Sequence, residues 1–260
     1  MLTVHNLNDV CLKLRHLADP EDAGFLQRFF KTGPGEYGEG DRFLGIRVPH
    51  LRHLARSCRT LPFDDLLKLL GSPWHEERLL ALIILVDHYK RGSETDRELI
   101  FQLYLTNTRY INSWDLVDIS AEHIVGAHID PGQIELLSQL ACSELLWDRR
   151  IAIVATFYWI KKDVFEPTLI IAASLIKDPH DLIHKAVGWM LREVGKRDRA
   201  TEESFLREHY RVMPRTMLRY AIEHFPEWHR QEYLKGRVIS VVTSETECHN
   251  AASALCQPGA

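Results

Sequence analysis

The sequence predicts an all-α protein built from repeated helix pairs, and three observations support this. Apolar residues recur with a helical period along nearly the whole chain. Turn and capping signals such as Asp19-Pro20 interrupt that period at short intervals. The β-branched cluster Ile151-Ala152-Ile153-Val154 lies inside a long helical pattern, so we assign it to buried helix rather than to a strand.

The turn signals divide the N-terminal part into successive elements. Helices are expected around residues 12–17, at 21–31, at 49–59, and from Pro62-Phe63-Asp64-Asp65 and Ser72-Pro73-Trp74 onward. Pro49 suits the first turn of its helix, where its missing N–H has no partner to lose. Between the second and third helices, the glycines and proline of residues 32–40 predict a loop. No Gly-Lys-Ser/Thr follows that loop, so it is not a phosphate-binding P-loop.

A weak repeat appears among the most apolar helices, whose starts recur about every 30 to 40 residues, as in HEAT-type helix pairs. Such pairs stack into a curved solenoid whose inner helices line a concave face. We therefore predict an all-α, curved solenoid of HEAT-like antiparallel helix pairs whose concave face binds a partner. Polar residues near the starts of the inner helices would lie along that face: Arg78, Asp118, Arg150, Lys185 and Arg215.

Composition places the chain among ordinary globular proteins. Of its 260 residues 45% are hydrophobic and 26% charged, and the longest apolar run, Leu79 to Val86, is too short to span a bilayer. No secretory signal is visible at the N-terminus. The five cysteines form no Cys-x-x-Cys pair, which argues against a disulfide framework or a zinc site and fits the cytoplasm. The net charge of −4 weighs against a generic nucleic-acid binder without excluding one.

Composition also sets the expected domain boundary. Residues 1–236 are predicted to form a single domain, and residues 237–260 a loosely ordered C-terminal tail with few charges and many small residues.

Trp114 and Asp118 are the most informative pair in the chain. Residues four apart share one face of a helix, so a π-surface would lie beside a negative charge. Such a pair suits a cation, or a sugar that develops cationic character. For this pair alone, a packing tryptophan and an aspartate beside a helix start is the commoner explanation. Two later segments, Trp147-Asp148-Arg149-Arg150 and Gly188-Trp189-Met190-Leu191-Arg192, carry partners of the same kind and favour a functional site.

Four stretches resemble the AlkD-type DNA alkylation repair proteins, a family of HEAT-like-repeat DNA glycosylases. They are Phe43-Leu44-Gly45-Ile46-Arg47-Val48-Pro49, Trp114-Asp115-Leu116-Val117-Asp118, Leu146-Trp147-Asp148-Arg149-Arg150-Ile151-Ala152-Ile153, and Lys185-Ala186-Val187-Gly188-Trp189-Met190-Leu191-Arg192-Glu193. Each is weak alone, but all four in this order are fairly specific, and the resemblance covers residues 10 to 236.

The resemblance implies a catalytic carboxylate at Asp118 and sugar-contacting tryptophans at Trp114 and Trp189. It places the functional arginine at Arg150, or at Arg149 if the alignment shifts by one residue. It implies hydrolysis of the N-glycosidic bond of cationic N3- and N7-alkylated purines in duplex DNA, which leaves an abasic site. The lesion would not need to be swung into a pocket.

The residues allow a simple mechanism. Alkylation already charges the purine, so its departure needs no general acid and no cofactor; Asp118 would stabilise the developing sugar cation and position a water molecule. Basic residues would hold the DNA backbone: Arg47, Arg52, Arg149, Lys185, Arg192 and Arg215. His75-Glu76 lacks a second histidine four residues from the first, so no metal is expected. The partner is therefore double-stranded DNA with alkylated purines, and we expect a monomer without membrane contact.

Two alternatives stay open. A non-catalytic HEAT-repeat scaffold that binds DNA or protein would suit the acidic net charge, although it has no need of the tryptophans, aspartate and arginine. An RNA-binding helical repeat would require base-reading polar pairs in every repeat, which we do not find. The chain also departs from the family pattern: Phe29 stands where a tyrosine can occur, and the Gly33–Gly40 loop is longer and richer in glycine than in some members. Whether that loop touches DNA is left open.

Overall fold

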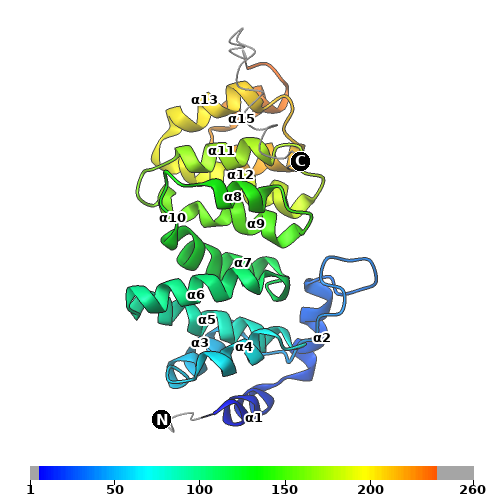
Figure 1. Ribbon diagram of the computed structural model, residues 1–260. Helices are drawn as coiled ribbons and strands as arrows, with labels where there is room; N and C mark the ends of the chain where they lie inside the picture. The colour runs from blue at the N-terminus through cyan, green and yellow to red at the C-terminus, as the bar shows by residue number, and fades with distance from the viewer. Residues whose placement is uncertain (1–5, 239–260) are drawn as a thin grey trace, which may run out of the picture. The chain divides into compact units, whose positions relative to one another are not determined.

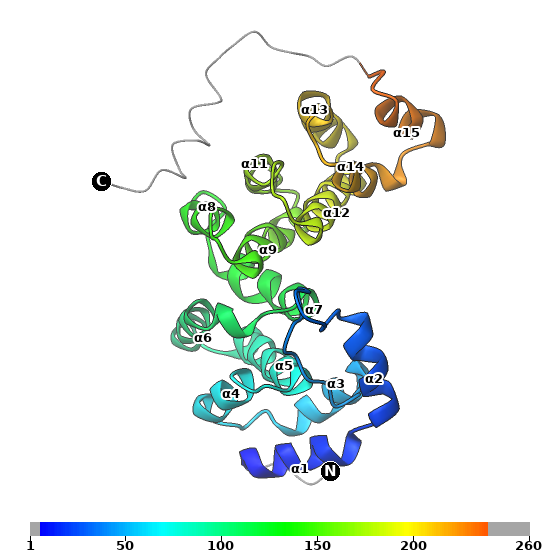
Figure 2. The ribbon, with the colours of Figure 1, turned by 90° about the vertical axis from the view of Figure 1, so that its right-hand side faces the viewer.

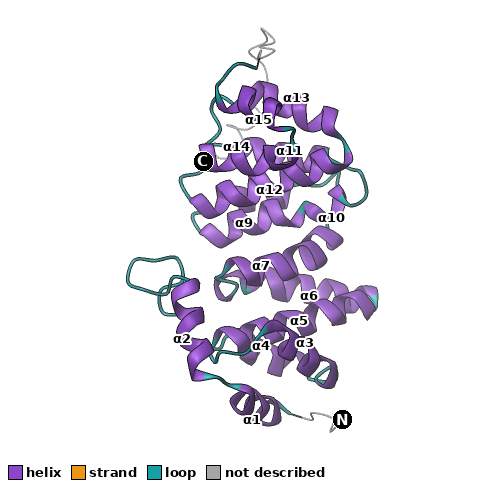
Figure 3. Ribbon diagram, turned by 180° about the vertical axis from the view of Figure 1, so that it is seen from behind, coloured by secondary structure: helices purple, strands orange, loops and turns teal. Residues whose placement is uncertain are grey.

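The computed structural model describes residues 6–238 and is helical throughout (Figures 1 and 3). Within that range no β-strand occurs, only an isolated bridge between Arg42 and Trp74. The predicted all-α class is confirmed, and the β-branched clusters do lie in helices. Most of the predicted tail, residues 239–260, lies outside the described residues. None of the described helices is both long and apolar enough to cross a membrane.

The chain forms two compact units, one running to Ile124 and the other starting at Val125. Unit 1 contains α1 (Leu7–Leu17), α2 (Pro20–Phe29), α3 (Val48–Ser57), α4 (Phe63–Leu70), α5 (His75–Arg91), α6 (Glu94–Thr106), the 3₁₀ turn η1 (Thr108–Tyr110) and α7 (Trp114–Ala121). Within it, α5 packs between α3 and α7, and α4 and α6 cover α5 from the other side (Figure 2).

Unit 2 repeats this two-layer arrangement. It contains α8 (Glu135–Ala141), α9 (Leu146–Ala155), α10 (Phe157–Ile160), α11 (Glu166–Ser174), α12 (Asp181–Arg197), α13 (Arg199–His209), α14 (Arg215–Ala221), the 3₁₀ turn η3 (Ile222–His224) and α15 (Glu227–Leu234). Here α12 packs between α9 and α14, while α8 packs on α9, and α11 and α13 cover α12 (Figure 2). A π-helical turn, η2 (Glu122–Gly126), follows α7 in the chain.

The helices of one layer carry the predicted repeat. α3, α5 and α7 in unit 1, and α9, α12 and α14 in unit 2, begin 27 to 39 residues after one another. Each packs side by side with its layer neighbour in the same unit. All four predicted catalytic residues and most of the predicted DNA-binding residues lie on these helices or at their caps.

Local signals set many of the helix ends. Asp19 caps α2 by accepting the backbone N–H groups of Glu21 and Asp22, and Pro20 and Pro49 occupy first turns. Ser93 and Asp96 form a reciprocal capping box at α6. The predicted helix limits are therefore right to within a few residues. Gly35 and Gly40 adopt positive φ angles, which explains their place in the predicted loop.

The segment that joins this loop to α3 packs unusually close to α2. Gly45 has φ +82°, and a Cβ there would lie 2.0 Å from the carbonyl oxygen of Asp19. The buried carboxylate of Glu76 accepts the backbone N–H groups of Leu44, Gly45 and Ile46 at 2.8, 2.8 and 3.1 Å. Glu76, at the start of α5, thus supplies acceptors for backbone N–H groups that an extended segment would otherwise leave unpaired.

One sequence expectation about an individual residue is wrong. Arg78 does not lie on a solvent-facing surface; it is buried and donates to Asp41 and to the carbonyl of Ser72. The cause is that α5 is covered at its first turn by the segment before α3. Among the tryptophans outside the candidate site, Trp159 is buried, whereas Trp228 is 69% exposed.

Candidate active site and nucleic-acid interface

The first turns of α7 hold Trp114 and Asp118. Trp114 is the first residue of the helix, after the N-cap Ser113, and Asp118 follows one turn later on the same face. Both side chains are partly exposed, whereas Leu116 and Val117 between them are fully buried. The predicted geometry of an indole beside a carboxylate at the surface of one helix is therefore present within unit 1.

The indole of Trp114 is fixed by stacked aromatic rings. Phe30, which follows α2, lies nearly parallel to it, with ring centroids 5.2 Å apart and an interplanar angle of 15°. Phe43 stacks on Phe30 at 5.0 Å, and the imidazole of His75 stacks on Phe43 at 4.5 Å. Phe29 approaches Trp114 edge-on, with centroids 6.1 Å apart. The ring cannot rotate without disturbing this set.

A buried ionic network holds the same end of α7. His75 is 2% exposed and lies between two carboxylates, with Nε2 2.8 Å from Asp115 Oδ2 and Nδ1 3.2 Å from Asp41 Oδ2. Asp41 also accepts hydrogen bonds from Arg78 at 2.6 Å and from Asn112 at 3.2 Å. Because Asp115 is the residue after Trp114, the network also helps to position Trp114.

The network sets its own protonation state. Burial alone would lower the pKa of His75, but the charge and hydrogen bond of Asp115, together with Asp41, outweigh it and raise the pKa to about 9. Burial alone would raise the pKa of Asp41, yet His75 and Arg78 hold it below its usual range. A charged imidazolium between two carboxylates is thus the stable arrangement at neutral pH.

Unit 2 carries the two predicted arginines on α9. Arg149 makes three hydrogen bonds, because Nε donates to Asp178 at 2.6 Å and Nη1 donates to the carbonyls of Ser143 and Glu144, both at 2.9 Å. Arg150 is 5% exposed, and its Nη1 donates to the carbonyl of Leu182 at 2.8 Å, in the first turn of α12. Both arginines tie α9 to neighbouring segments.

Trp189 lies on α12 and is partly exposed. Its indole Nε1 donates to Glu193 at 3.1 Å, and the ring of Phe157 lies 5.6 Å away. The preceding residue is glycine because α14 comes very close: a Cβ at Gly188 would lie 2.4 Å from the carbonyl oxygen of Met217. Gly188 therefore allows α12 and α14 to pack closely, whereas the side chain of Trp189 contacts Phe157 and Glu193.

The other predicted DNA-binding cations are mostly paired within their own unit. Arg47 bonds to Asp22 through Nε at 2.7 Å, and Lys185 to Asp181 at 2.7 Å. Arg192 lies against Glu223 and Glu193, and Arg215 donates to the carbonyl of Leu234 at 2.9 Å. Arg52 differs, since it is exposed and makes no ion pair or hydrogen bond with another described residue.

Arg52 lines a groove of about 330 Å³ between α3, α5 and α7. Arg56, Arg59, Lys90 and His123 line it too, with Asp87 as the one carboxylate among its lining residues. Arg59 pairs with Asp87 at 2.9 Å, whereas Arg56 and Lys90, like Arg52, have no such partner among the described residues. The sequence predicted Arg52 as a DNA-binding residue but gave no sign of Lys90 and His123, which are distant from it in the chain.

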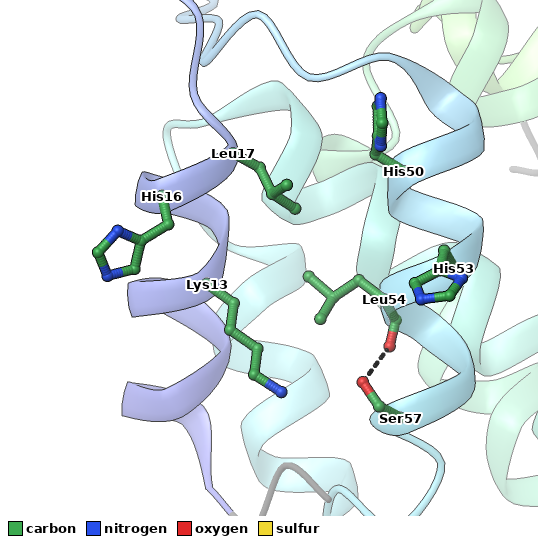
Figure 4. A pocket seen from close by; sticks show the side chains of 7 residues that line it. All are labelled: Lys13, His16, Leu17, His50, His53, Leu54 and Ser57. Carbon is green, nitrogen blue, oxygen red and sulfur yellow. Dashed lines mark hydrogen bonds between the residues drawn. The ribbon is translucent and has the colours of Figure 1, made fainter. Parts of the chain in front are cut away.

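A second pocket, of about 290 Å³, lies between α1 and α3 and is lined by three histidines, His16, His50 and His53 (Figure 4). Their rings do not converge: His16 projects from α1 away from the two histidines of α3 (Figure 4). Among residues 6–238 no group of three or more His, Cys, Asp or Glu side chains could hold a metal ion.

The structure is therefore that of an all-α helical-repeat protein. It carries a partly exposed indole and a partly exposed carboxylate on the surface of one helix. A family model described as DNA alkylation repair enzyme matches residues 10–225. The chain therefore belongs to the DNA alkylation repair enzyme family, as its sequence motifs suggested. No curated protein matches the chain.

Two solved structures resemble the fold. One is a predicted DNA alkylation repair enzyme from Enterococcus faecalis, with a TM-score of 0.61 and 18% identity, covering 81% of this chain and 97% of that one. The other is smu.31 from Streptococcus mutans UA159, with a TM-score of 0.50 and 14% identity, covering 83% of this chain and 95% of that one. At these identities the likeness concerns the fold alone.

Proposed function

We propose that this protein is a monofunctional DNA glycosylase that removes cationic N3- and N7-alkylated purines from duplex DNA. The observation that carries the proposal is the start of α7, where a partly exposed carboxylate lies one turn from an indole that stacked rings hold in place. Membership of the DNA alkylation repair enzyme family supports a substrate of this kind.

The chemistry asks little of the protein. An alkylated purine carries a positive charge, so the C1′–N bond breaks with its electron pair moving to the base, which leaves neutral. Asp118 would oppose the positive charge that develops on the sugar. It would also accept the proton of the water molecule whose oxygen bonds to C1′, and pass that proton to solvent. A neutral base has no such internal driving force and would leave too slowly.

The two tryptophans would add selectivity for the transition state. Trp114 and Trp189 can each present π-surface to a deoxyribose with cationic character, a contact of roughly 0.5–2 kcal/mol. Arg150, buried on α9, would either contact a backbone phosphate or position the protein segment that contacts one. Arg47, Arg52, Arg149, Lys185, Arg192 and Arg215 remain the proposed contacts to flanking phosphates, with Arg56, Arg59 and Lys90 added by the groove.

The acidic net charge does not oppose this function. The groove carries four Arg and Lys side chains against one carboxylate, although the chain as a whole has a charge of −4. Local charge, rather than the sum, determines where a polyanion binds. Some of the chain's carboxylates are neutralised in intramolecular ion pairs such as Asp22–Arg47 and Asp178–Arg149.

Base release tests the proposal directly. The protein is incubated with a duplex containing 7-methylguanine at one position, and released base and abasic sites are quantified. A duplex of the same sequence with uracil, a neutral base, is the control. We expect release of 7-methylguanine and equimolar abasic sites, with no release of uracil. Binding of both duplexes without release of either base would instead identify a non-catalytic helical-repeat scaffold.

A further inference from the structure

Helix α2 exposes an aromatic pair for which neither the fold nor the proposed chemistry accounts. None of its ten residues is buried. Phe25 and Phe29, one turn apart, are 47% and 54% exposed, and their rings are near parallel, with centroids 6.1 Å apart. Two large apolar rings held side by side in water are costly, because each would gain free energy by burial.

The helix that carries the pair is nevertheless firmly anchored at both ends. At its start, the backbone N–H of Asp19 donates to the carbonyl of Leu44 at 2.9 Å, and Asp22 pairs with Arg47. At its end, Phe30 is buried in the aromatic stack beneath Trp114. The exposed rings are therefore presented on a fixed support rather than left on a loose segment.

The pair is continuous with the candidate active site. Phe29 contacts Trp114 edge-on at 6.1 Å, and Phe25 extends the aromatic surface by one further helical turn. The guanidinium of Arg47 lies 5.6 Å from the ring centroid of Phe25 and is half exposed, so a cation accompanies the rings. Flat aromatic surface beside a cation is the combination that binds an unstacked base and its phosphate.

We propose that Phe25 and Phe29 form a stacking platform for a nucleobase that has lost a stacking neighbour beside the reacting nucleotide. In an intact duplex the faces of the bases cover one another, so the platform has nothing to bind. Loss of the alkylated purine opens a gap and exposes such a face. This inference rests on the proposed function only in locating the reacting nucleotide at Trp114 and Asp118.

The platform would retain the protein on its own product. It predicts tighter binding to a duplex with a gap in the base stack than to an intact duplex. It also predicts that the difference depends on π-surface and not merely on apolar area, because stacking on aromatic rings is sequence-tolerant and substantial for each base.

The test measures affinity with three duplexes of one sequence: an intact duplex, one with a tetrahydrofuran abasic analogue, and one in which a pyrene nucleotide opposite that analogue fills the gap. The proteins are the full chain, Phe25→Leu/Phe29→Leu, and Leu12→Ala/Val212→Ala. Leucine keeps apolar bulk and helix propensity but has no ring. Leu12 and Val212 are exposed apolar residues away from α2 and serve as the matched control. Circular dichroism and sedimentation check that fold and mass are unchanged.

We expect the full chain and the control variant to bind the abasic duplex roughly tenfold more tightly than the intact duplex. Filling the gap with pyrene should abolish that preference, and the double leucine variant should lose most of it. An unchanged preference in the leucine variant, or no preference in the full chain, would overturn the platform. The platform would also be overturned if the full chain were a dimer and the leucine variant a monomer with an unchanged DNA preference. The rings would then serve self-association.

The tetrahydrofuran analogue has no glycosidic bond to a base, so these affinities do not depend on catalysis. A chain that releases no 7-methylguanine yet shows the Phe-dependent preference would refute the proposed function and keep the platform. A chain that releases the base without such a preference would support the proposed function and refute the platform.

Discussion

The indole of Trp114 has one face occupied, and this decides what the residue can still do. Phe30 lies parallel to it at 5.2 Å, so only the partly exposed remainder of the ring is open to a ligand. Asp118 lies one turn further along that helix face. A sugar that reached the carboxylate would therefore meet the ring without either side chain having to move, which is what stabilising a short-lived cation requires.

Glu202 is a carboxylic acid buried in the core of unit 2. It is 1% exposed on α13, its carboxyl packs against the backbone of Gly195, and its Oε1 has no hydrogen-bond partner among the described residues. Burial raises its pKa to about 8, although Arg199 partly opposes this. Its folded pKa lies above its ordinary value of 4.5, so the stability that it supports is present below that value and is lost as pH rises toward 8.

Glu202→Gln should therefore stabilise the protein at alkaline pH. At pH 9 we expect a gain of about 1–3 kcal/mol in the free energy of unfolding, because no buried charge has to form, and little difference below pH 4.5. Urea unfolding at the two pH values measures this. Glu144→Gln, which neutralises an exposed carboxylate in the same unit, is the control and should stabilise at neither pH.

At the residue scale, sequence reasoning found what lies along one helix and missed what the fold brings from elsewhere. Trp114 and Asp118 were recognisable because a spacing of four defines a helix face. Phe30 and His75 were not, because they stand 84 and 39 positions before Trp114, and only tertiary packing brings Phe30 onto Trp114 and His75 onto the adjacent Asp115. His75 was considered only as a metal ligand.

At the scale of elements, the start of α7 depends on the ion network of His75. The folded pKa of this imidazole, about 9, lies above its ordinary value of 6.5. The stability that it contributes is therefore complete below pH 6.5 and is lost as pH rises through 9. Asp41, whose pKa is lowered, acts in the opposite sense and loses its contribution only as pH falls through the acid range.

Asp115→Asn tests this arrangement. The substitution keeps a hydrogen-bonding group but removes the charge that raises the pKa of His75, so the decline in unfolding free energy between pH 6.5 and 9 should become shallower. Both proteins in this comparison also carry Glu202→Gln. Glu202 would otherwise add its own decline in unfolding free energy between pH 4.5 and 8. An equal decline with and without Asp115 would show that His75 is not the titrating group.

The contact between α12 and α14 gives a second prediction at this scale. Gly188→Ala would bring a Cβ to 2.4 Å from the carbonyl oxygen of Met217 and 2.5 Å from the Cβ of Tyr220. Neither helix can yield without losing packing, so we expect a loss of about 1–3 kcal/mol in unfolding free energy. Gly132→Ala, whose Cβ would meet nothing closer than 3.4 Å, should stay within about 0.5 kcal/mol of the parent. Equal effects would mean that the helices separate freely.

Element boundaries were largely predictable, for local reasons. Asp19-Pro20, Pro49 and the glycine-rich segment after α2 act on the backbone beside them, and such signals do not depend on the rest of the fold. The burial of Arg78 was not predictable, since it follows from the segment around Asp41 folding back onto α5.

At the scale of the whole molecule, the proposed DNA binding depends on a surface built from several helices. The groove between α3, α5 and α7 gathers Arg52, Arg56, Arg59 and Lys90 from α3, the turn that follows it and α5. Each phosphate that such a cation neutralises releases counterions, so binding should weaken as salt rises.

Arg52→Gln and Arg56→Gln should each lower the slope of log affinity against log salt by about 0.9, on intact and damaged duplexes alike. Arg97→Gln is the control, because Arg97 is exposed on α6 and does not line the groove. Titration of a fluorescent duplex at several salt concentrations measures the slopes. Slopes equal to that of the parent would remove these arginines from the interface.

The repeat spacing was enough to predict the helical-repeat class, because helix pairs of similar length recur along the chain. It did not predict the division into two compact units at Ile124 and Val125. That boundary lies in the π-helical turn Glu122–Gly126, where no proline or charge run interrupts the helical pattern.

The role of Asp118 is the central claim, and single-turnover release of 7-methylguanine tests it most directly. Asp118→Asn is compared with the parent and with Asp64→Asn, an exposed carboxylate on α4. The account predicts that the Asp118 variant binds the duplex like the parent but releases the base at least about a hundredfold more slowly. It also predicts that Asp64→Asn releases the base normally. Release by Asp118→Asn at the parental rate would contradict it.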